Sequence, residues 1–250
     1  MLEIKSLSKN FGGVKALDML DLSIDHGVIF GIIGPNGSGK STLVNVICGV
    51  FPPSKGEVVF LKKNIGSYST HKRLSSGIAR TFQNIRLFPN LTVWQNLWVA
   101  RNSEEDINNE SMFSRWLGRN LIVKKEIEEI LEFSNLGDKA DELASSLAFG
   151  EQRRLELARA SATKPRLLLL DEPAAGMNKD EIRDLDKRIR ELQKKGTTII
   201  LVEHVMELVM GVTDRIAVLN FGSKIAEGTP DEIQMNEAVQ EAYLGFTEEN

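Results

Sequence analysis

A glycine-rich octapeptide between two apolar segments constrains the fold of this chain more than any other feature. Residues 34–41 read GPNGSGKS, which fits the pattern G-x-x-x-x-G-K-[ST]. An apolar run at 28–33, typical of a buried strand, precedes the octapeptide, and a helix-like apolar segment at 43–47 follows it. A loop that leads from a strand into a helix points several backbone N–H groups and the positive helix end at one place. The pattern therefore predicts an α/β fold that binds the phosphates of a nucleoside triphosphate.

The residue types in this loop suit separate parts of phosphate binding. Gly37 and Gly39 let the backbone come close to the ligand. The Lys40 ammonium can reach the β- and γ-phosphate oxygens, and the Ser41 hydroxyl can bind Mg²⁺. A chance match in a glycine-rich turn is the alternative, which the flanking strand and helix disfavour. The residues expected to contact the nucleotide are Gly34, Pro35, Asn36, Gly37, Ser38, Gly39, Lys40, Ser41 and Thr42.

Composition narrows the class of protein. The chain has 250 residues, 42% of them hydrophobic, which suffices for a real core in one large domain or two small ones. Its 31 basic and 35 acidic residues give a net charge of −4, so we expect no broad nucleic-acid-binding surface. The single cysteine, Cys48, lies among apolar residues and is expected to be a core residue in a protein of the reducing cytoplasm.

Neither a signal peptide nor a membrane span is predicted. Charged residues interrupt the N-terminal segment 1–7, where a signal peptide needs a continuous apolar region. The longest apolar runs, such as 167–170 and 199–202, fall far short of the roughly 20 residues that span a bilayer. If the protein serves a membrane, we expect it to do so through a partner.

The order of predicted elements indicates an α/β core interrupted by helices. Strand patterns occur at 2–5, 20–25, 57–60, 78–82, 167–170, 197–202, 215–220 and 224–227. Helical patterns occur at 92–100, 124–133 and 180–195, and a polar, acidic loop is predicted at 102–110. We therefore predict one domain over 1–250, in which 1–83 and 163–250 form the core and 84–162 form a helical subdomain.

Two adjacent carboxylates follow a buried strand. The four leucines at 167–170 lead directly into Asp171 and Glu172, and ligands of parallel sheets bind at the carboxyl ends of the strands. Asp171 is expected to hold Mg²⁺, directly or through water, and Glu172 to polarise the attacking water. A strand that merely ends in a helix cap is the alternative, which the phosphate loop upstream disfavours.

Gln83 and His204 are two further candidates at predicted strand ends. His204 follows the strand after the carboxylates, so it is expected to lie beside them and to reach the γ-phosphate. Gln83 ends the predicted strand 78–82, and its amide is expected to contact Mg²⁺ and the attacking water. A structural histidine and a surface glutamine are the simpler alternatives.

A second glycine-containing turn opens a helix at 147–152. Close backbone access at a helix start favours anion binding. No phosphate-binding element of the same chain is predicted near this turn, so the residues alone leave its purpose open.

Together these motifs resemble the nucleotide-binding subunits of ATP-binding cassette (ABC) transporters, over essentially the whole chain. Residues 34–41 resemble the Walker A loop, Gln83 the Q-loop glutamine, 147–152 the signature loop and 167–171 the Walker B strand. Glu172 then resembles the catalytic glutamate, 174–178 the D-loop and His204 the switch histidine. Phe11 occupies the position of the aromatic residue that stacks on adenine.

This resemblance implies an α/β P-loop NTPase (RecA-like) core with an N-terminal antiparallel β subdomain and an inserted α-helical subdomain. It implies ATP and Mg²⁺ as ligands, and a head-to-tail dimer with a second ATPase subunit, identical or paralogous. In such a dimer the signature loop of one subunit closes on the γ-phosphate held by the other. The residues that would do so here are Ala148, Phe149, Gly150 and Glu151.

Three motifs depart from the family pattern: the signature loop, the D-loop and the adenine-stacking position. The usual signature is Leu-Ser-Gly-Gly-Gln, so Ala148 replaces serine, Phe149 replaces glycine and Glu151 replaces glutamine. Asn178 stands where many members carry aspartate, and Phe11 is often tyrosine. Because the phosphate loop, the metal ligand and the catalytic acid are all present, we still expect an active ATPase.

Within the family, several stretches resemble the importers of branched-chain and other hydrophobic amino acids: 76–84, 87–97, 150–158, 173–178 and 241–245. The ATPases of urea importers and lipopolysaccharide exporters share much of this sequence and remain as alternatives. A soluble non-transport cassette or a P-loop kinase fits less well. The resemblance places the chain peripherally on the cytoplasmic face of the membrane, bound to transmembrane permease subunits and linked through them to a solute-binding protein.

An apolar stretch follows Gln83. Most of its large side chains are expected to form local core, and an exposed minority would form a socket for a short helix of the permease. The six side chains are Ile85, Leu87, Phe88, Leu91, Trp94 and Trp98.

Overall fold

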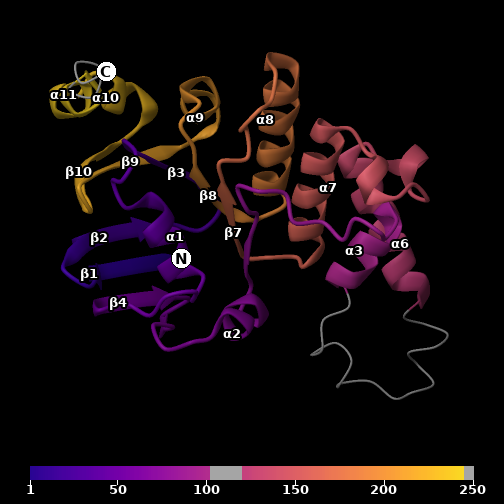
Figure 1. Cartoon of the computed structure of the whole chain (residues 1–250), viewed down its shortest axis with the longest axis horizontal. Helices are drawn as coiled ribbons and strands as arrows, with labels where there is room; N and C mark the ends of the chain where they lie inside the picture. Colours follow the sequence, from indigo (N-terminus) through magenta and orange to yellow (C-terminus); the bar gives the residue numbers. More distant parts are fainter. Residues whose placement is uncertain (102–119, 245–250) are drawn as a thin grey trace.

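The computed structural model describes residues 1–101 and 120–244, which form two sheets and a group of helices (Figure 1). The loop predicted at 102–110 lies outside these residues. The antiparallel sheet, at the lower left of Figure 1, contains β1 (Leu2–Phe11), β2 (Val14–Ile24), β4 (Lys55–Phe60) and β5 (Lys63–Asn64) in the order β2-β1-β4-β5. β1 and β2 run longer than predicted, because irregularities in their pairing break the alternation that marks a strand in sequence.

The second sheet carries the phosphate loop. Its strand order is β10-β9-β3-β8-β7-β6, and all neighbours are parallel except β10 and β9. The strands are β3 (Ile29–Ile33), β6 (Ile78–Arg80), β7 (Leu167–Asp171), β8 (Thr198–Val202), β9 (Arg215–Asn220) and β10 (Ser223–Gly228). Every residue of β3, β7 and β8 is buried, as expected for parallel strands covered on both faces.

Two layers cover this sheet. On one face, α8 (Lys179–Lys194) and α9 (Met206–Val212) pack on Leu168, Leu170 and their neighbours in β8. On the other face, α1 (Lys40–Ile47) and the antiparallel sheet pack on Leu167 and Leu169. The four leucines therefore serve both layers, because successive side chains of a strand point to opposite faces. The C-terminal α10 (Pro230–Gln234) and α11 (Glu237–Leu244) pack beside β9 and β10.

A separate core joins α3 (Val93–Arg101), α6 (Asn120–Ser134) and α7 (Phe149–Ala162), at the right of Figure 1. The first of these helices begins as its sequence predicts: Thr92 Oγ1 accepts a hydrogen bond from Gln95 N at 3.1 Å, and Gln95 Oε1 accepts one from Thr92 N at 2.9 Å. Short α2 (Thr70–Ser75) and two 3₁₀ turns (Gly137–Lys139 and Ala144–Ser146) complete the described elements. The boundaries 83/84 and 162/163 of the helical subdomain stay predictions.

Two local details differ from, or refine, the expected elements. β6 ends at Arg80 rather than at residue 82, so Gln83 stands three residues beyond the strand. The hairpin between β9 and β10 turns at Phe221 and Gly222, whose φ angles of 44° and 81° match the favoured two-residue turn. Among the residues that the structure describes, no helix has the length and apolar character needed to span a membrane.

Candidate nucleotide-binding site

The phosphate loop lies between β3 and α1, as predicted. Gly37 has a φ of 80° and nothing within 4 Å of the place where a Cβ would be, so the loop is open to a ligand there. Gly34 is the opposite case, because a Cβ would lie 2.1 Å from the Leu219 carbonyl oxygen. The first N–H groups of α1 have no acceptor within the helix, and they begin at Lys40. The loop thus offers the backbone donors that a phosphate needs.

Lys40 folds back over the loop. Its Nζ donates to the Gly34 carbonyl oxygen at 2.6 Å and to the Pro35 carbonyl oxygen at 2.9 Å. Burial lowers the pKa of Lys40, whereas the charges of Glu172 and Asp171 oppose that shift. The ammonium therefore sits between the loop and two carboxylates. The other loop positions differ in exposure: Ser38 and Gly34 are buried, Pro35, Gly39 and Thr42 are partly buried, and Asn36, Gly37 and Ser41 are exposed.

Asp171 ends β7 and is paired with an arginine that the sequence analysis did not single out. Arg80 Nη2 lies 2.6 Å from Asp171 Oδ2, and Arg80 Nη1 donates to Asn45 Oδ1 of α1 at 2.7 Å. Both charged side chains are largely buried, with relative exposures of 12% and 7%. The sequence feature that could have indicated this pair is a basic residue at the end of β6, the strand that neighbours β7.

The donors present suit Mg²⁺ bound mainly through a nucleotide. Within residues 1–101 and 120–244, no group of three or more His, Cys, Asp or Glu side chains is placed to hold a metal ion. Mg²⁺ in nucleotide sites is bound through oxygen ligands, commonly one or two carboxylates together with phosphate oxygens and water. Ser41, Asp171 and Gln83 supply a hydroxyl, a carboxylate and an amide oxygen, which fit that pattern.

Three predicted catalytic residues meet at one carboxylate oxygen. Gln83 Nε2 donates to Glu172 Oε2 at 2.7 Å, and His204 Nδ1 lies 3.9 Å from the same oxygen. Glu172 has a φ of 48°, a left-handed conformation that costs a non-glycine residue about 1–3 kcal/mol. Its N–H donates to the Val202 carbonyl oxygen at 2.8 Å, which helps to hold this conformation at the end of β7.

Glu203 organises the backbone around that centre. It is 1% exposed; its Oε1 accepts from Ala174 N at 2.8 Å, and its Oε2 accepts from His204 N at 2.7 Å and Val205 N at 3.0 Å. One buried carboxylate therefore ties the start of the D-loop segment to the histidine. The sequence places Glu203 beside His204 but does not reveal these contacts.

Phe11 lies at the end of β1 with a partly exposed ring. Its ring packs edge-on against Phe51, with centroids 5.1 Å apart, and Lys9 Nζ lies 5.0 Å from the Phe11 centroid. The ring is 41% exposed, which leaves it accessible to a flat ligand.

The signature loop opens α7 and lies against α8. Ala148 precedes the helix and brings no side-chain cap, but Glu151 Oε2 accepts a hydrogen bond from Ala148 N at 3.0 Å. A Cβ at Gly150 would lie 2.3 Å from Glu181 Oε1, so a side chain there would require the Glu181 carboxylate to move. Phe149 is 47% exposed and lies over Gly176 of the D-loop segment, where a Cβ would meet the ring at 3.3 Å.

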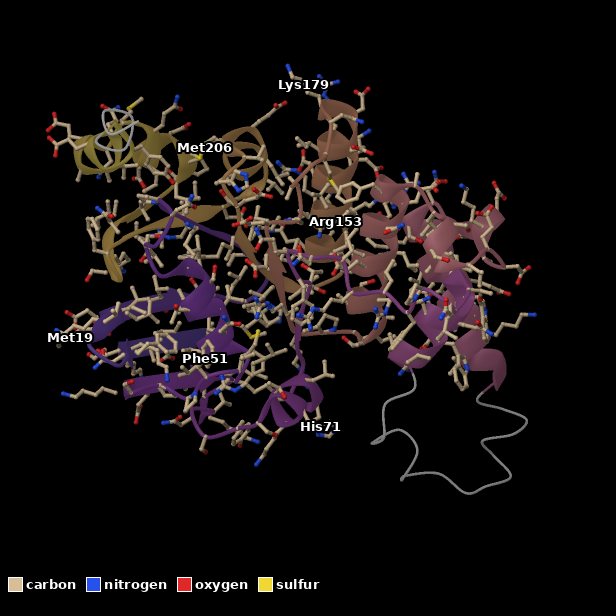
Figure 2. All side chains as sticks on the ribbon, in the orientation of Figure 1. Met19, Phe51, His71, Arg153, Lys179 and Met206 are labelled. Atoms are coloured by element: carbon tan, nitrogen blue, oxygen red, sulfur yellow. The ribbon has the colours of Figure 1, made fainter. Side chains whose placement is uncertain are left out.

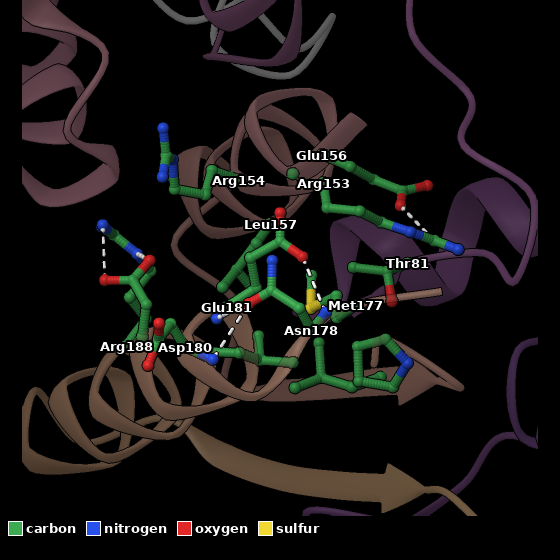
Figure 3. Close-up of a pocket in the computed structure, with 15 residues that line it drawn as sticks. Thr81, Arg153, Arg154, Glu156, Leu157, Met177, Asn178, Asp180, Glu181 and Arg188 are labelled. Carbon is green, nitrogen blue, oxygen red and sulfur yellow. Dashed lines mark hydrogen bonds and ion pairs between the residues drawn. The ribbon is translucent and has the colours of Figure 1, made fainter. Parts of the chain in front are cut away.

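A cavity of about 280 Å³ lies between α7 and α8 (Figure 3). Gly150, Arg153, Glu181 and Arg188 are among the residues that line it. Asn178, the departure in the D-loop, caps α8 at the rim: its Oδ1 accepts from the N–H groups of residues 180 and 181 at 3.0 and 3.1 Å. An asparagine suits this position, since it is among the preferred N-cap residues.

Comparison with known proteins agrees with these motifs. The ABC transporter family matches residues 17–175, and the family described as branched-chain amino acid ATP-binding cassette transporter matches residues 223–245. The high-affinity branched-chain amino acid transport ATP-binding protein LivG of Salmonella typhimurium is 40% identical over 252 residues, and BraF of Pseudomonas aeruginosa is 38% identical over 253 residues. In both cases 98% of each chain is covered.

Solved structures share the fold. The ADP conformation of MJ1267, an ATP-binding cassette of an ABC transporter, superposes with a TM-score of 0.85 at 34% identity and 98% coverage of both chains. A dimeric post-hydrolysis state of the cassette MJ0796, bound to ADP and Pi, gives 0.77 at 26% identity, with 92% of this chain and 99% of that one covered. The chain therefore belongs to the ABC transporter family, as an ATP-binding subunit of its branched-chain amino acid transport branch.

Proposed function

We propose that this chain hydrolyses ATP on the cytoplasmic face of the membrane to power the import of branched-chain or other hydrophobic amino acids. The observation that carries the proposal is the contact of Gln83 with Glu172 at 2.7 Å, with His204 beside it, at the end of the strand that holds Asp171. This arrangement supplies a carboxylate for the attacking water next to a phosphate loop. The relatives' names and the match at residues 223–245 favour amino acids over urea or lipopolysaccharide as the solute.

In the proposed reaction the loop holds the β- and γ-phosphates, and Lys40 exchanges the Gly34 and Pro35 carbonyls for phosphate oxygens. Glu172 orients a water molecule and takes its proton as the water oxygen bonds to the γ-phosphorus. The bond to the β–γ bridging oxygen breaks, and ADP and phosphate leave. His204 contacts the γ-phosphate, and Phe11 stacks on the adenine.

Mg²⁺ fits the same site. Ser41, Asp171 and Gln83 would hold the ion, which would neutralise charge that develops on the phosphates. Arg80 Nη2 contacts Asp171 Oδ2 at 2.6 Å, so a bound metal would share the charge of this carboxylate with the arginine.

A second subunit completes the site in the proposed assembly. Ala148, Phe149, Gly150 and Glu151 lie at the start of α7, against α8 rather than at the loop of their own chain. We propose that they close on the γ-phosphate of a second copy or a paralogue in a head-to-tail dimer. Dimeric ABC cassettes among the matching solved structures support this arrangement.

The permease is proposed to bind the apolar stretch after Gln83. Phe88 and Trp98 are 44% and 42% exposed, and Trp98 stacks on Trp94 with centroids 6.4 Å apart. The other four side chains (Ile85, Leu87, Leu91 and Trp94) are partly buried. The exposed pair supplies the aromatic anchors that favour protein interfaces. The solute-binding protein would act through the permease alone.

Substitution of Glu172 tests the proposal directly. Glu172→Gln removes the base and keeps the phosphate cradle, so the variant should bind ATP as the wild type does, hydrolyse it about 10²–10⁴-fold more slowly and accumulate as a dimer. Hydrolysis by Glu172→Gln at the wild-type rate would contradict the assignment of the base.

A further inference from the structure

Charged side chains of α7 are buried against the segment that leads out of β6. Arg153, which is labelled in Figure 2, and Glu156 are only 8% and 6% exposed. Burial of this kind is costly unless each charge is paired and hydrogen-bonded. None of the roles assigned above uses either side chain, so their burial requires another explanation.

Both side chains bond to the backbone of residues 82–86, which contain Gln83 and are called the Q-loop below. Arg153 Nη1 donates to the Phe82 carbonyl oxygen at 3.1 Å, and Nη2 donates to the Gln83 carbonyl oxygen at 2.6 Å. Glu156 Oε1 accepts from Phe82 N at 3.4 Å and from Arg86 N at 3.3 Å. The two side chains also pair with each other, Arg153 Nη1 lying 3.2 Å from Glu156 Oε2, as Figure 3 shows beside the cavity.

These side-chain hydrogen bonds satisfy backbone groups of residues 82–86 that no strand or helix satisfies. The last ladder-like bond after β6 is Thr81 N to the Leu169 carbonyl oxygen at 2.9 Å, and residues 82–86 belong to neither a strand nor a helix. Backbone groups that leave a sheet need new partners. Arg153 and Glu156 make four such hydrogen bonds, and Arg159 Nη1 donates to the Arg86 carbonyl oxygen, so side chains of α7 set the path of the chain between Phe82 and Arg86.

Gln83 is consequently held at both ends. Its carbonyl oxygen accepts from Arg153 of α7, while its side-chain amide donates to Glu172 at the end of β7. A shift of α7 relative to the sheet would therefore move the amide relative to the catalytic carboxylate. The same helix begins at Phe149, about one turn before Arg153, at the loop proposed to face the second subunit.

We propose that Arg153 and Glu156 are positioning residues for ATP hydrolysis: they fix the backbone of residues 82–86 so that the Gln83 amide reaches Glu172, and they tie this contact to the signature helix. The inference rests on the proposed function, because it takes Gln83 to act in hydrolysis. The proposal adds two residues that contact neither the phosphate loop nor Asp171 and Glu172.

Each substitution has a distinct expected effect. Arg153→Met removes the hydrogen-bond donors to the Phe82 and Gln83 carbonyl oxygens and leaves Glu156 without its cationic partner. Arg153→Lys keeps the charge but lacks the planar fork that serves two carbonyls at once, so it should be intermediate. Arg188→Met is the matched control, since Arg188 is also a buried arginine (9% exposed) that pairs with a carboxylate of its own helix, Asp184 at 2.8 Å, and none of its hydrogen bonds reaches the Q-loop.

The first measurement is amide hydrogen exchange over residues 82–86 in the full-length protein without nucleotide. Arg153→Met should raise exchange at least about tenfold there, and Arg188→Met should leave it unchanged. Unchanged exchange in Arg153→Met overturns the positioning role. This readout does not depend on ATPase activity, so it stands apart from any failure of the proposed function, which an active Glu172→Gln variant would reveal.

The second measurement is a double-mutant cycle of kcat with Gln83→Ala. Arg153→Met should lower kcat about tenfold with the Kd for ATP within about twofold of wild type, and should add less than about twofold in the Gln83→Ala background. An equal loss in both backgrounds means that Arg153 acts through general stability, which overturns the proposal. If Arg153→Met fails to fold, Arg153→Lys is carried through the same cycle and must show the same non-additivity at smaller amplitude; additive effects overturn the proposal.

Discussion

Gln83 Nε2 lies 2.7 Å from Glu172 Oε2, which joins a residue three positions beyond β6 to the residue directly after β7. The amide donor at this oxygen fixes the direction of the carboxylate. Replacing the donor by alanine should therefore affect the chemical step more than binding. Gln83→Ala should lower kcat about 10–100-fold and leave the Kd for ATP within about twofold. Gln240→Ala, a surface amide on α11, serves as the control, and a normal kcat in Gln83→Ala would argue against a role in hydrolysis.

The Arg80–Asp171 pair predicts a link between stability and metal binding. Arg80→Met leaves Asp171 buried without its cation, and breaking a buried ion pair in this way costs about 3–5 kcal/mol. We expect a lower free energy of unfolding in urea, and a larger gain in stability from Mg·ATP than in the wild type, because the metal replaces the lost positive charge. Equal stabilisation of both proteins by Mg·ATP would show that Asp171 does not bind the metal.

Because Ala148 lacks a hydroxyl, we expect that a substitution there can raise the affinity of the ATP-driven dimer. A serine hydroxyl there can reach a γ-phosphate across the dimer, and a hydrogen bond to a charged group contributes about 1.5–3 kcal/mol. Ala148→Ser in the Glu172→Gln background should therefore tighten ATP-driven dimerisation by roughly tenfold or more, measured by analytical ultracentrifugation.

The same substitution also creates a standard N-cap for α7, which contributes about 1 kcal/mol to the stability of the monomer. The melting temperature of the monomer without ATP separates the two effects. A higher melting temperature with unchanged dimer affinity would mean that the hydroxyl caps the helix and does not contact the phosphate.

Cys48 should be slow to react in the native protein. Burial raises the pKa of its thiol to about 11, with Arg80 and Arg73 opposing the shift. Because the thiolate is the reactive form, alkylation by iodoacetamide at pH 8 should be about 100-fold slower in the folded than in the unfolded protein. The folded-state rate should keep rising with pH up to about 11, whereas a plateau near pH 9 would contradict the raised pKa.

The exposed aromatic pair predicts a coupling defect. Phe88→Asp or Trp98→Asp should lower the ratio of permease-stimulated to basal ATP hydrolysis in reconstituted vesicles, since a charge at the centre of an interface is poorly tolerated. Met235→Asp, at a residue 79% exposed on the distant C-terminal region, should leave that ratio unchanged. An undiminished ratio in both aromatic variants would place the permease elsewhere.

Local patterns in the sequence are sufficient to predict most of the helices, strands and turns. The periodic helix predicted at 180–195 is α8, with Ile182, Leu185, Ile189 and Leu192 buried, and the Phe221–Gly222 turn forms the expected hairpin. These features depend on residues close together in the chain. β1 is longer than predicted because bulges interrupt its alternation. β6 is shorter than predicted because only Thr81 N continues the ladder beyond Arg80 before the chain leaves the sheet.

The sequence alone determined which chemistry is available: a phosphate loop at 34–41, adjacent acids at 171–172, an amide at 83 and an imidazole at 204. The tertiary structure decided which of these groups touch. Glu172 meets Gln83 because β6 and β7 are neighbours in the sheet, and Asp171 meets Arg80 for the same reason, across 91 positions of chain. The hydrogen bonds from Arg153 and Glu156 to the Q-loop join residues about 70 positions apart. Their partners are backbone groups, which all residue types except proline share, so the sequence of the Q-loop does not reveal them.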